Sequence, residues 1–85
     1  MNYPQYRRLV NGKVYYKIIE ANVMEEIGTM GEKWWRNRLE AKILPERLMI
    51  SDMVDGTNTG VEAIDEAEYL AFERNCENDK QQIAI

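Results

Sequence analysis

The chain has 85 residues, of which 45% are hydrophobic and 31% are charged, and its formal net charge is −4 at pH 7. This composition is typical of a folded globular protein, and the length allows one domain because it is too short to bury two independent cores. A single cysteine and the absence of histidine exclude an internal disulfide and the commonest zinc ligand sets.

The first predicted element is a β-hairpin. Residues 5–10 and 13–19 are rich in Tyr, Val and Ile, and both segments suit β-strands. The dipeptide between them, Asn11-Gly12, favours the two positive φ angles of a type I′ turn. We therefore expect a two-residue loop that brings the two segments together as antiparallel neighbours.

This loop fixes which side chains share a face of the hairpin. Arg8 lies opposite Tyr15, and Tyr6 lies opposite Lys17, on one side. The other side is apolar and is expected to face the core; it consists of Leu9, Val14, Tyr16 and Ile18. The polar and aromatic side is then expected to remain free of helices.

A short helix is predicted after the hairpin, because Val23, Met24 and Ile27 have helical spacing. Gly28 or Gly31 would end it. A third strand is predicted over residues 34–42, with its odd-numbered residues toward the core and its even-numbered residues away from it. Trp34 and Trp35 therefore point to opposite sides of this strand.

The second half of the chain predicts two more helices around a short strand. Pro45 suits the first position of a helix that stops at Asp55-Gly56. Residues 61–64 form a strand, and Asp65 caps a last helix. The predicted order is ββαβαβα: an α+β fold with a small sheet of about four strands and helices on one face.

We expect one compact domain over residues 1–77 and a C-terminal tail over residues 78–85. The predicted single core consists of Leu9, Val14, Tyr16, Ile18, Ile27, Trp35, Leu39, Leu48, Met53, Ile64, Tyr69 and Phe72. Apolar runs are far shorter than the ~20 residues of a membrane helix, and the polar N-terminus lacks a signal-peptide apolar region. We therefore expect a cytoplasmic protein without a membrane contact.

Charge and aromatic residues are divided unequally along the chain. Residues 1–42 hold eight Lys/Arg and five Asp/Glu, whereas residues 43–85 hold three and ten. Six of the eight aromatic residues also lie in the first half. A basic, aromatic surface suits protein partners or single-stranded nucleic acids, whereas an acidic surface mainly solubilises.

The predicted binding surface is the helix-free face of the sheet. It consists of Tyr6, Arg8, Tyr15, Lys17, Trp34, Arg36 and Arg38. Trp and Arg are favoured anchors of protein interfaces, so the first hypothesis is a non-enzymatic binding module for a protein partner or for itself. The alternative is single-stranded nucleic acid (RNA) binding by the same face, although no RNP-type motif is present.

Neither catalysis nor a cofactor is predicted. Residues 55–66 meet three spacing demands of an EF-hand, but Thr57 and Thr59 leave too little negative charge, so no metal site is expected. The carboxylates are spaced as ordinary solvated helix faces. Cys76 aligns with Tyr69 and Phe72 and suits a core thiol better than a nucleophile.

Overall fold

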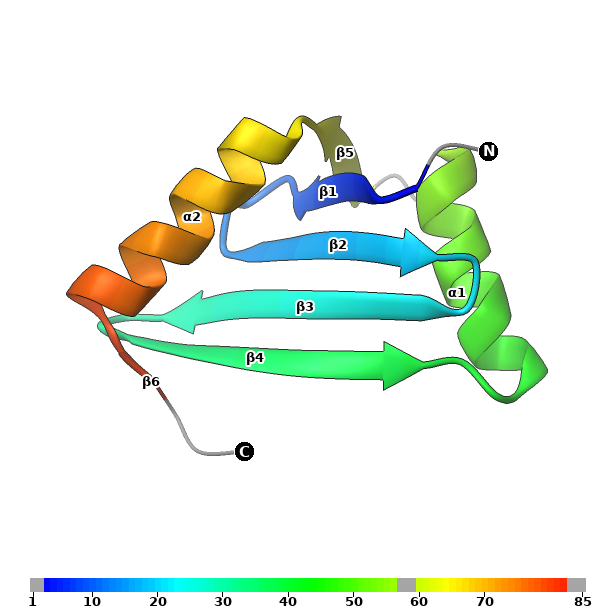
Figure 1. Cartoon of the computed structure of the whole chain (residues 1–85), viewed down its shortest axis with the longest axis horizontal. Coiled ribbons are helices and arrows are strands. Elements are labelled where there is room, and N and C mark those ends of the chain that lie inside the picture. Colours follow the sequence, from blue (N-terminus) through cyan, green and yellow to red (C-terminus); the bar gives the residue numbers. More distant parts are fainter. Residues whose placement is uncertain (1–2, 57–59, 83–85) are drawn as a thin grey trace.

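The computed structural model describes residues 3–56 and 60–82, and it shows one β-sheet with a helix on each face. The strand order is β5-β1-β2-β3-β4-β6, and neighbours are antiparallel except β4 and β6 (Figure 1). The elements are β1 Gln5–Leu9, β2 Val14–Glu20, β3 Val23–Met30, β4 Lys33–Glu40, α1 Leu44–Asp55, β5 Val61–Ile64, α2 Glu66–Asp79 and β6 Gln81–Gln82. The small α+β class is confirmed. The described part of the chain has six strands, however, and its order differs from ββαβαβα.

The first hairpin has the predicted register but a different turn. Arg8 pairs with Tyr15 and Tyr6 pairs with Lys17, as expected. Only Gly12 of the loop dipeptide has a positive φ, 74°, and its N–H donates to the carbonyl of Leu9 at 2.8 Å. The type I′ prediction was therefore wrong. The hydrogen-bonded turn runs from Leu9 to Gly12, and Gly12 alone has a left-handed backbone conformation.

The predicted helix at residues 23–27 is wrong, because these residues begin β3. Met24 and Ile27 point to opposite faces of this strand, and both side chains are buried. A strand covered on both faces loses the alternation of apolar and polar residues that identifies a half-exposed strand. Met24 and Ile27, two buried side chains three residues apart, therefore have the same spacing as the apolar residues of a helix.

The helices cover both faces of the sheet, in contrast to the predicted arrangement on one face. Figure 1 shows α1 crossing one end of the strands and α2 crossing the other. On the α2 face the buried cluster is Tyr6, Tyr15, Ile27, Trp34, Tyr69 and Cys76. On the α1 face it is Tyr16, Ile18, Met24, Ala41, Ile50 and Met53. The predicted single core is therefore two half-cores, and Leu48, assigned to it, is exposed.

Both helices begin where the sequence indicates. The carboxylate of Glu46 accepts hydrogen bonds from the N–H groups of Lys42 and Ile43, at 3.1 and 3.3 Å, at the start of α1. The side chain of Asp65 accepts from the N–H of Glu68 at 2.8 Å at the start of α2. These carboxylates satisfy backbone donors that have no partner within the helix.

The described part of the predicted tail lies against the end of β4. Helix α2 continues to Asp79, and the Lys80 ammonium donates to the carbonyl of Gly31 at 3.0 Å. The N–H of Gln81 donates to the carbonyl of Glu32 at 3.1 Å, which starts the short pairing of β6 with β4. Residues 83–85 of that tail lie outside the described residues.

Gly28 on β3 makes room for the indole of Trp35 on β4. The two residues are paired across the strands, and a Cβ at position 28 would lie 2.0 Å from Cζ2 of Trp35. The indole therefore lies over the backbone of β3 on the α1 face. This close approach requires a residue without a side chain.

We expect Gly28→Ala to lower the free energy of unfolding by about 1–3 kcal/mol, because the added methyl group must displace the indole. Urea unfolding followed by circular dichroism measures the change. The matched background is Trp35→Ala, where Gly28→Ala should be neutral or stabilising, since the steric conflict is gone and Ala suits a strand better than Gly. An equal loss in both backgrounds would contradict the proposed packing.

Candidate functional site

The structure places the predicted binding residues on one face of the sheet, but this face lies under α2. The side chains of Tyr6, Tyr15 and Trp34 are only 7%, 8% and 5% exposed. The expected exposure of these rings was therefore wrong. Their burial follows from the position of α2, whose residues Tyr69 and Cys76 belong to the same cluster.

Aromatic contacts fasten α2 to this face. The ring of Tyr15 stacks on that of Phe72, with centroids 3.9 Å apart and planes inclined by 12°. The rings of Tyr6 and Tyr69 lie 5.2 Å apart in a tilted arrangement. The hydroxyl of Tyr6 donates to a carboxylate oxygen of Glu66 at 2.9 Å. Each aromatic side chain of the face thus has its partner within the chain.

The cations on the same face pair with acids from the second half of the chain. Arg8 forms ion pairs with Glu62 of β5 and with Glu68 of α2, the latter at 2.7 Å. Arg36 pairs with Glu73 of α2, and its guanidinium carbon lies 5.6 Å from the ring centroid of Trp34. Acids from the second half of the chain therefore pair with two of the cations on this face, Arg8 and Arg36.

Arg38 and Lys17 complete the predicted set. Arg38 is exposed, and its Nε lies 3.5 Å from a carboxylate oxygen of Glu40 on the same strand. Lys17 is half-buried and lies directly opposite Glu25 in the register of β2 and β3. Of the seven predicted residues, Trp34, Arg36 and Arg38 lie on β4, and Trp34 is paired with Gln82 of β6.

The outer edge of β4 is unpaired along most of its length in the described chain, because β6 pairs only with Lys33 and Trp34. The N–H of Ala41 points inward to the carbonyl of Asn22 at 2.7 Å, whereas the carbonyl of Glu32 points outward to Gln81. Backbone groups alternate in direction along a strand. The N–H and C=O groups of Arg36, Arg38 and Glu40 therefore point away from β3 toward solvent.

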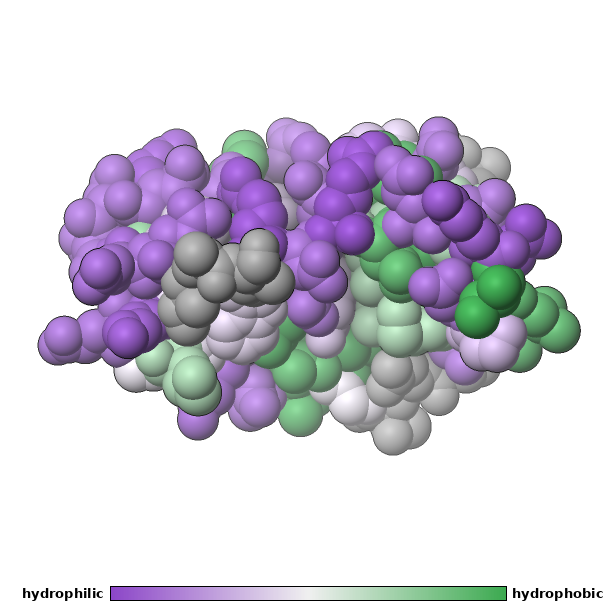
Figure 2. Space-filling model, turned by 90° about the horizontal axis from the view of Figure 1, so that it is seen from below, coloured by the Kyte–Doolittle hydropathy of each residue, from purple (hydrophilic) through white to green (hydrophobic). Residues whose placement is uncertain are grey.

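An apolar patch lies on the same side of the molecule as this edge. It consists of Ile43, Leu44, Leu48 and Met49, whose exposed fractions are 60%, 66%, 52% and 40%. Figure 2, which looks onto the β4 side of the sheet, shows hydrophobic atoms gathered at the end where the chain enters α1. Sequence reasoning missed this patch, although the run Leu48-Met49-Ile50 cannot bury all three side chains on one helix face.

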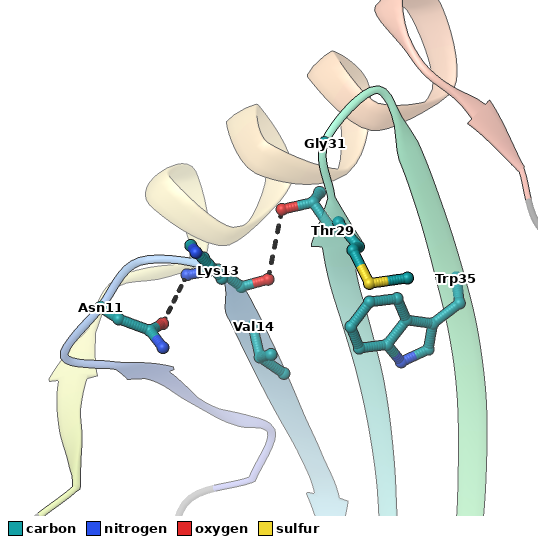
Figure 3. A pocket seen from close by; sticks show the side chains of 7 residues that line it. Asn11, Lys13, Val14, Thr29, Gly31 and Trp35 are labelled. Carbon is teal, nitrogen blue, oxygen red and sulfur yellow. Dashed lines mark hydrogen bonds between the residues drawn. The ribbon is translucent and has the colours of Figure 1, made fainter.

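A pocket of about 490 Å³ opens on the α1 face, near the β1–β2 and β3–β4 turns. Its lining includes Val14 of β2, Thr29 and Met30 of β3, and Trp35 of β4. Figure 3 shows the indole of Trp35 lying across β3 on the side of Val14. Thr29 donates its hydroxyl to the carbonyl of Lys13 at 3.4 Å, and Asn11 and Lys13 also line the pocket. The pocket therefore lies at the end of β4 opposite to the apolar patch, which follows Glu40.

The groups considered for catalysis or metal binding are the Cys76 thiol and the EF-hand-like loop. Burial raises the pKa of the Cys76 thiol, which opposes formation of the nucleophilic thiolate, while Lys80 and Arg36 act in the other direction. In residues 3–56 and 60–82 no group of three or more Cys, Asp or Glu side chains is arranged to hold a metal ion. Thr57 and Thr59 of the EF-hand-like loop lie outside the described residues.

Comparison of the chain with protein-family models, with curated proteins and with solved structures found no match. Within the described part of the chain, neither helix has the length and apolar character needed to cross a bilayer. The open β4 edge and the apolar surface beside it are therefore the features from which a function must be inferred.

The stacking of Phe72 on Tyr15 generates a stability prediction. We expect Phe72→Ala to lower the free energy of unfolding by about 3 kcal/mol, because it removes a packed ring between α2 and the sheet. Chemical denaturation measures the loss. Leu70→Ala, at a position 40% exposed on the same helix, is the control and should change little. Equal effects of the two substitutions would show that α2 is not docked through Phe72.

Buried phenols on the α2 face predict a loss of stability at alkaline pH. Burial raises the pKa of Tyr6 to about 12, and the Glu66 carboxylate adds to the shift as hydrogen-bond acceptor and as a negative charge. Burial also raises the pKa of Tyr69. A raised pKa means that the folded state holds the proton more tightly than the unfolded state. The resulting stabilisation is complete below about pH 10 and is lost as the pH rises toward 12.

Unfolding free energies measured between pH 9 and 12 should therefore fall with pH, and Tyr6→Phe should remove part of this fall. Glu66→Gln should have a similar, smaller effect, because it removes the charge but keeps an acceptor. A pH dependence identical in the wild type and in Tyr6→Phe would contradict the burial of this phenol against Glu66.

Proposed function

We propose that this chain is a small non-enzymatic binding module that contacts a protein partner, or a second copy of itself, through the outer edge of β4. The observation that carries the proposal is the row of outward backbone groups at Arg36, Arg38 and Glu40 beside an exposed apolar patch. Extended segments bind such edges as an added strand, in which main-chain hydrogen bonds supply affinity and side-chain contacts supply specificity.

The proposed surface keeps part of the face predicted from the sequence. Arg36 and Arg38 lie on β4 and remain in it, whereas Tyr6 and Tyr15 belong to the core under α2. Trp35, which the sequence assigned to the core, is half-buried and lies next to the edge on the α1 face. It takes the place of Trp34 as the aromatic residue available to a partner.

Binding of single-stranded nucleic acid has less support. It requires aromatic rings for stacking and cations for phosphates on one accessible surface. The rings of Tyr6, Tyr15 and Trp34 are covered, and the cations of Arg8 and Arg36 are paired with carboxylates. The net charge of −4 also opposes attraction of a polyanion.

Proline substitution at the edge tests the proposal. Arg38→Pro removes an N–H that points away from β3, so it should block an added strand without breaking the β3–β4 ladder. Ala63→Pro is the matched control, because Ala63 is exposed on the opposite edge strand, β5. Both variants should keep a cooperative thermal unfolding transition.

Immobilised wild type and both variants are compared by mass spectrometry of the proteins that each retains from nuclease-treated lysate, together with a measurement of self-association. We expect Arg38→Pro to lose at least tenfold in retained partner or in self-association, and Ala63→Pro to behave as wild type. Loss of all retention on nuclease treatment, or oligonucleotide binding that weakens steeply with salt, would favour the nucleic-acid alternative instead.

A further inference from the structure

We infer that the occupant of the β4 edge is a second copy of this chain, paired antiparallel about a two-fold axis that passes beside Leu39. The inference rests on the proposed function, because it names the partner of the same edge. In a two-fold arrangement the same strand serves both copies, so every contact occurs twice. The length, charge and apolar character of β4 each favour this partner.

The open part of the edge has the length that this pairing needs. Within the described residues it begins after Trp34, where the pairing with β6 stops, and it extends past Glu40 to the start of α1 at Leu44. With the axis beside Leu39, Arg36 lies opposite the partner's Lys42, and Arg38 lies opposite the partner's Glu40. Arg38 of one copy and Glu40 of the other can then exchange both of their outward backbone hydrogen bonds, as an antiparallel ladder requires, whereas the N–H of Lys42 already donates to Glu46 of its own chain.

The charges of β4 select this register over its neighbours. Arg38 and Glu40 are both more than half exposed at their side chains, 53% and 60%. With the axis beside Leu39, each Arg38 meets a Glu40 of the other copy. This arrangement forms two symmetric ion pairs across the seam, the line along which the two β4 strands meet. An axis beside Arg38 would place this cation against itself, and an axis beside Asn37 would place Arg36 against Arg38. Both alternatives bring two β4 arginines together. The axis beside Leu39 sets Arg36 opposite the partner's Lys42, but Arg36 is already paired with Glu73 of its own α2.

The α1 face of the seam is apolar in the same register. Leu39 lies against its own copy, and Trp35 lies opposite the partner's Ile43. Ile43 suits a strand partner because its backbone is extended, with φ −117° and ψ 159°, and its side chain is 60% exposed. Pairing would therefore cover an exposed Ile and a half-buried Trp on each side of the axis, which supplies the hydrophobic part of the association.

Charge exchange at the seam provides the test. Arg38→Glu places two pairs of glutamates across the axis, and Glu40→Arg places two pairs of arginines. We expect the wild type to form a dimer in sedimentation equilibrium and each single variant to have a dissociation constant raised about tenfold or more. The double variant Arg38→Glu/Glu40→Arg, and the equimolar mixture of the two single variants, should recover the dimer because opposite charges face each other again.

A covalent measurement checks the register independently. Two cysteines directly opposite in an antiparallel pair have the Cα separation of a disulfide. Leu39→Cys should therefore form a cross-linked dimer under mild oxidation, whereas Asn37→Cys, which lies opposite Ala41 of the second copy, should not. The native Cys76 is buried and does not compete.

Several results would overturn the inference. They are a wild type that stays monomeric up to about 1 mM, a dimer that is insensitive to charge exchange, or cross-linking of Asn37→Cys in preference to Leu39→Cys. A monomer that still retains another protein in a manner blocked by Arg38→Pro would overturn the second copy as occupant but leave the proposed function intact. A monomer that retains nothing would remove both.

Discussion

The packing of an acidic helix on a basic, aromatic sheet face is the interaction on which this fold depends. Helix α2 places Tyr69 and Phe72 against the rings of β1 and β2, while Glu68 and Glu73 reach the arginines at either side. Partly exposed ion pairs contribute at most about 1 kcal/mol each, whereas packed aromatic pairs contribute more once their buried area is included. The rings therefore hold the helix, and the charges determine how it is oriented.

Local features of the fold were predictable from the sequence, and the layering was not. The hairpin register and the cap at Asp65 depend on neighbouring residues, so both could be predicted, although the turn type at Asn11-Gly12 was predicted wrongly. The strand nature of residues 23–27 depends on helices that arrive from the distant second half of the chain to cover both faces. No local pattern reports this, because a strand buried on both sides has no alternation.

The division of charge along the chain was visible in the sequence, but its structural meaning was reversed. We expected the basic and acidic halves to form two separate surfaces; instead one half covers the other. A signal existed in α2, where Glu66 and Glu73 share the helical stripe of Tyr69. Acids on the same stripe as buried rings indicate a helix that packs on a basic surface. Because a helix packs on each face of the sheet, the proposed binding surface is a sheet edge, the outer edge of β4, and not the face predicted from the sequence.

Strand β6 has a consequence for how the sheet can grow. It is parallel to β4 and, within the described residues, pairs with Lys33 and Trp34, so it blocks one end of the outer edge of β4. A strand that enters along β4 can slide no further than this point, and its length is limited to the few residues that remain. Long, unobstructed edges allow slippage and fibrous stacking of chains. A shorter edge accepts a shorter added strand and leaves it fewer registers.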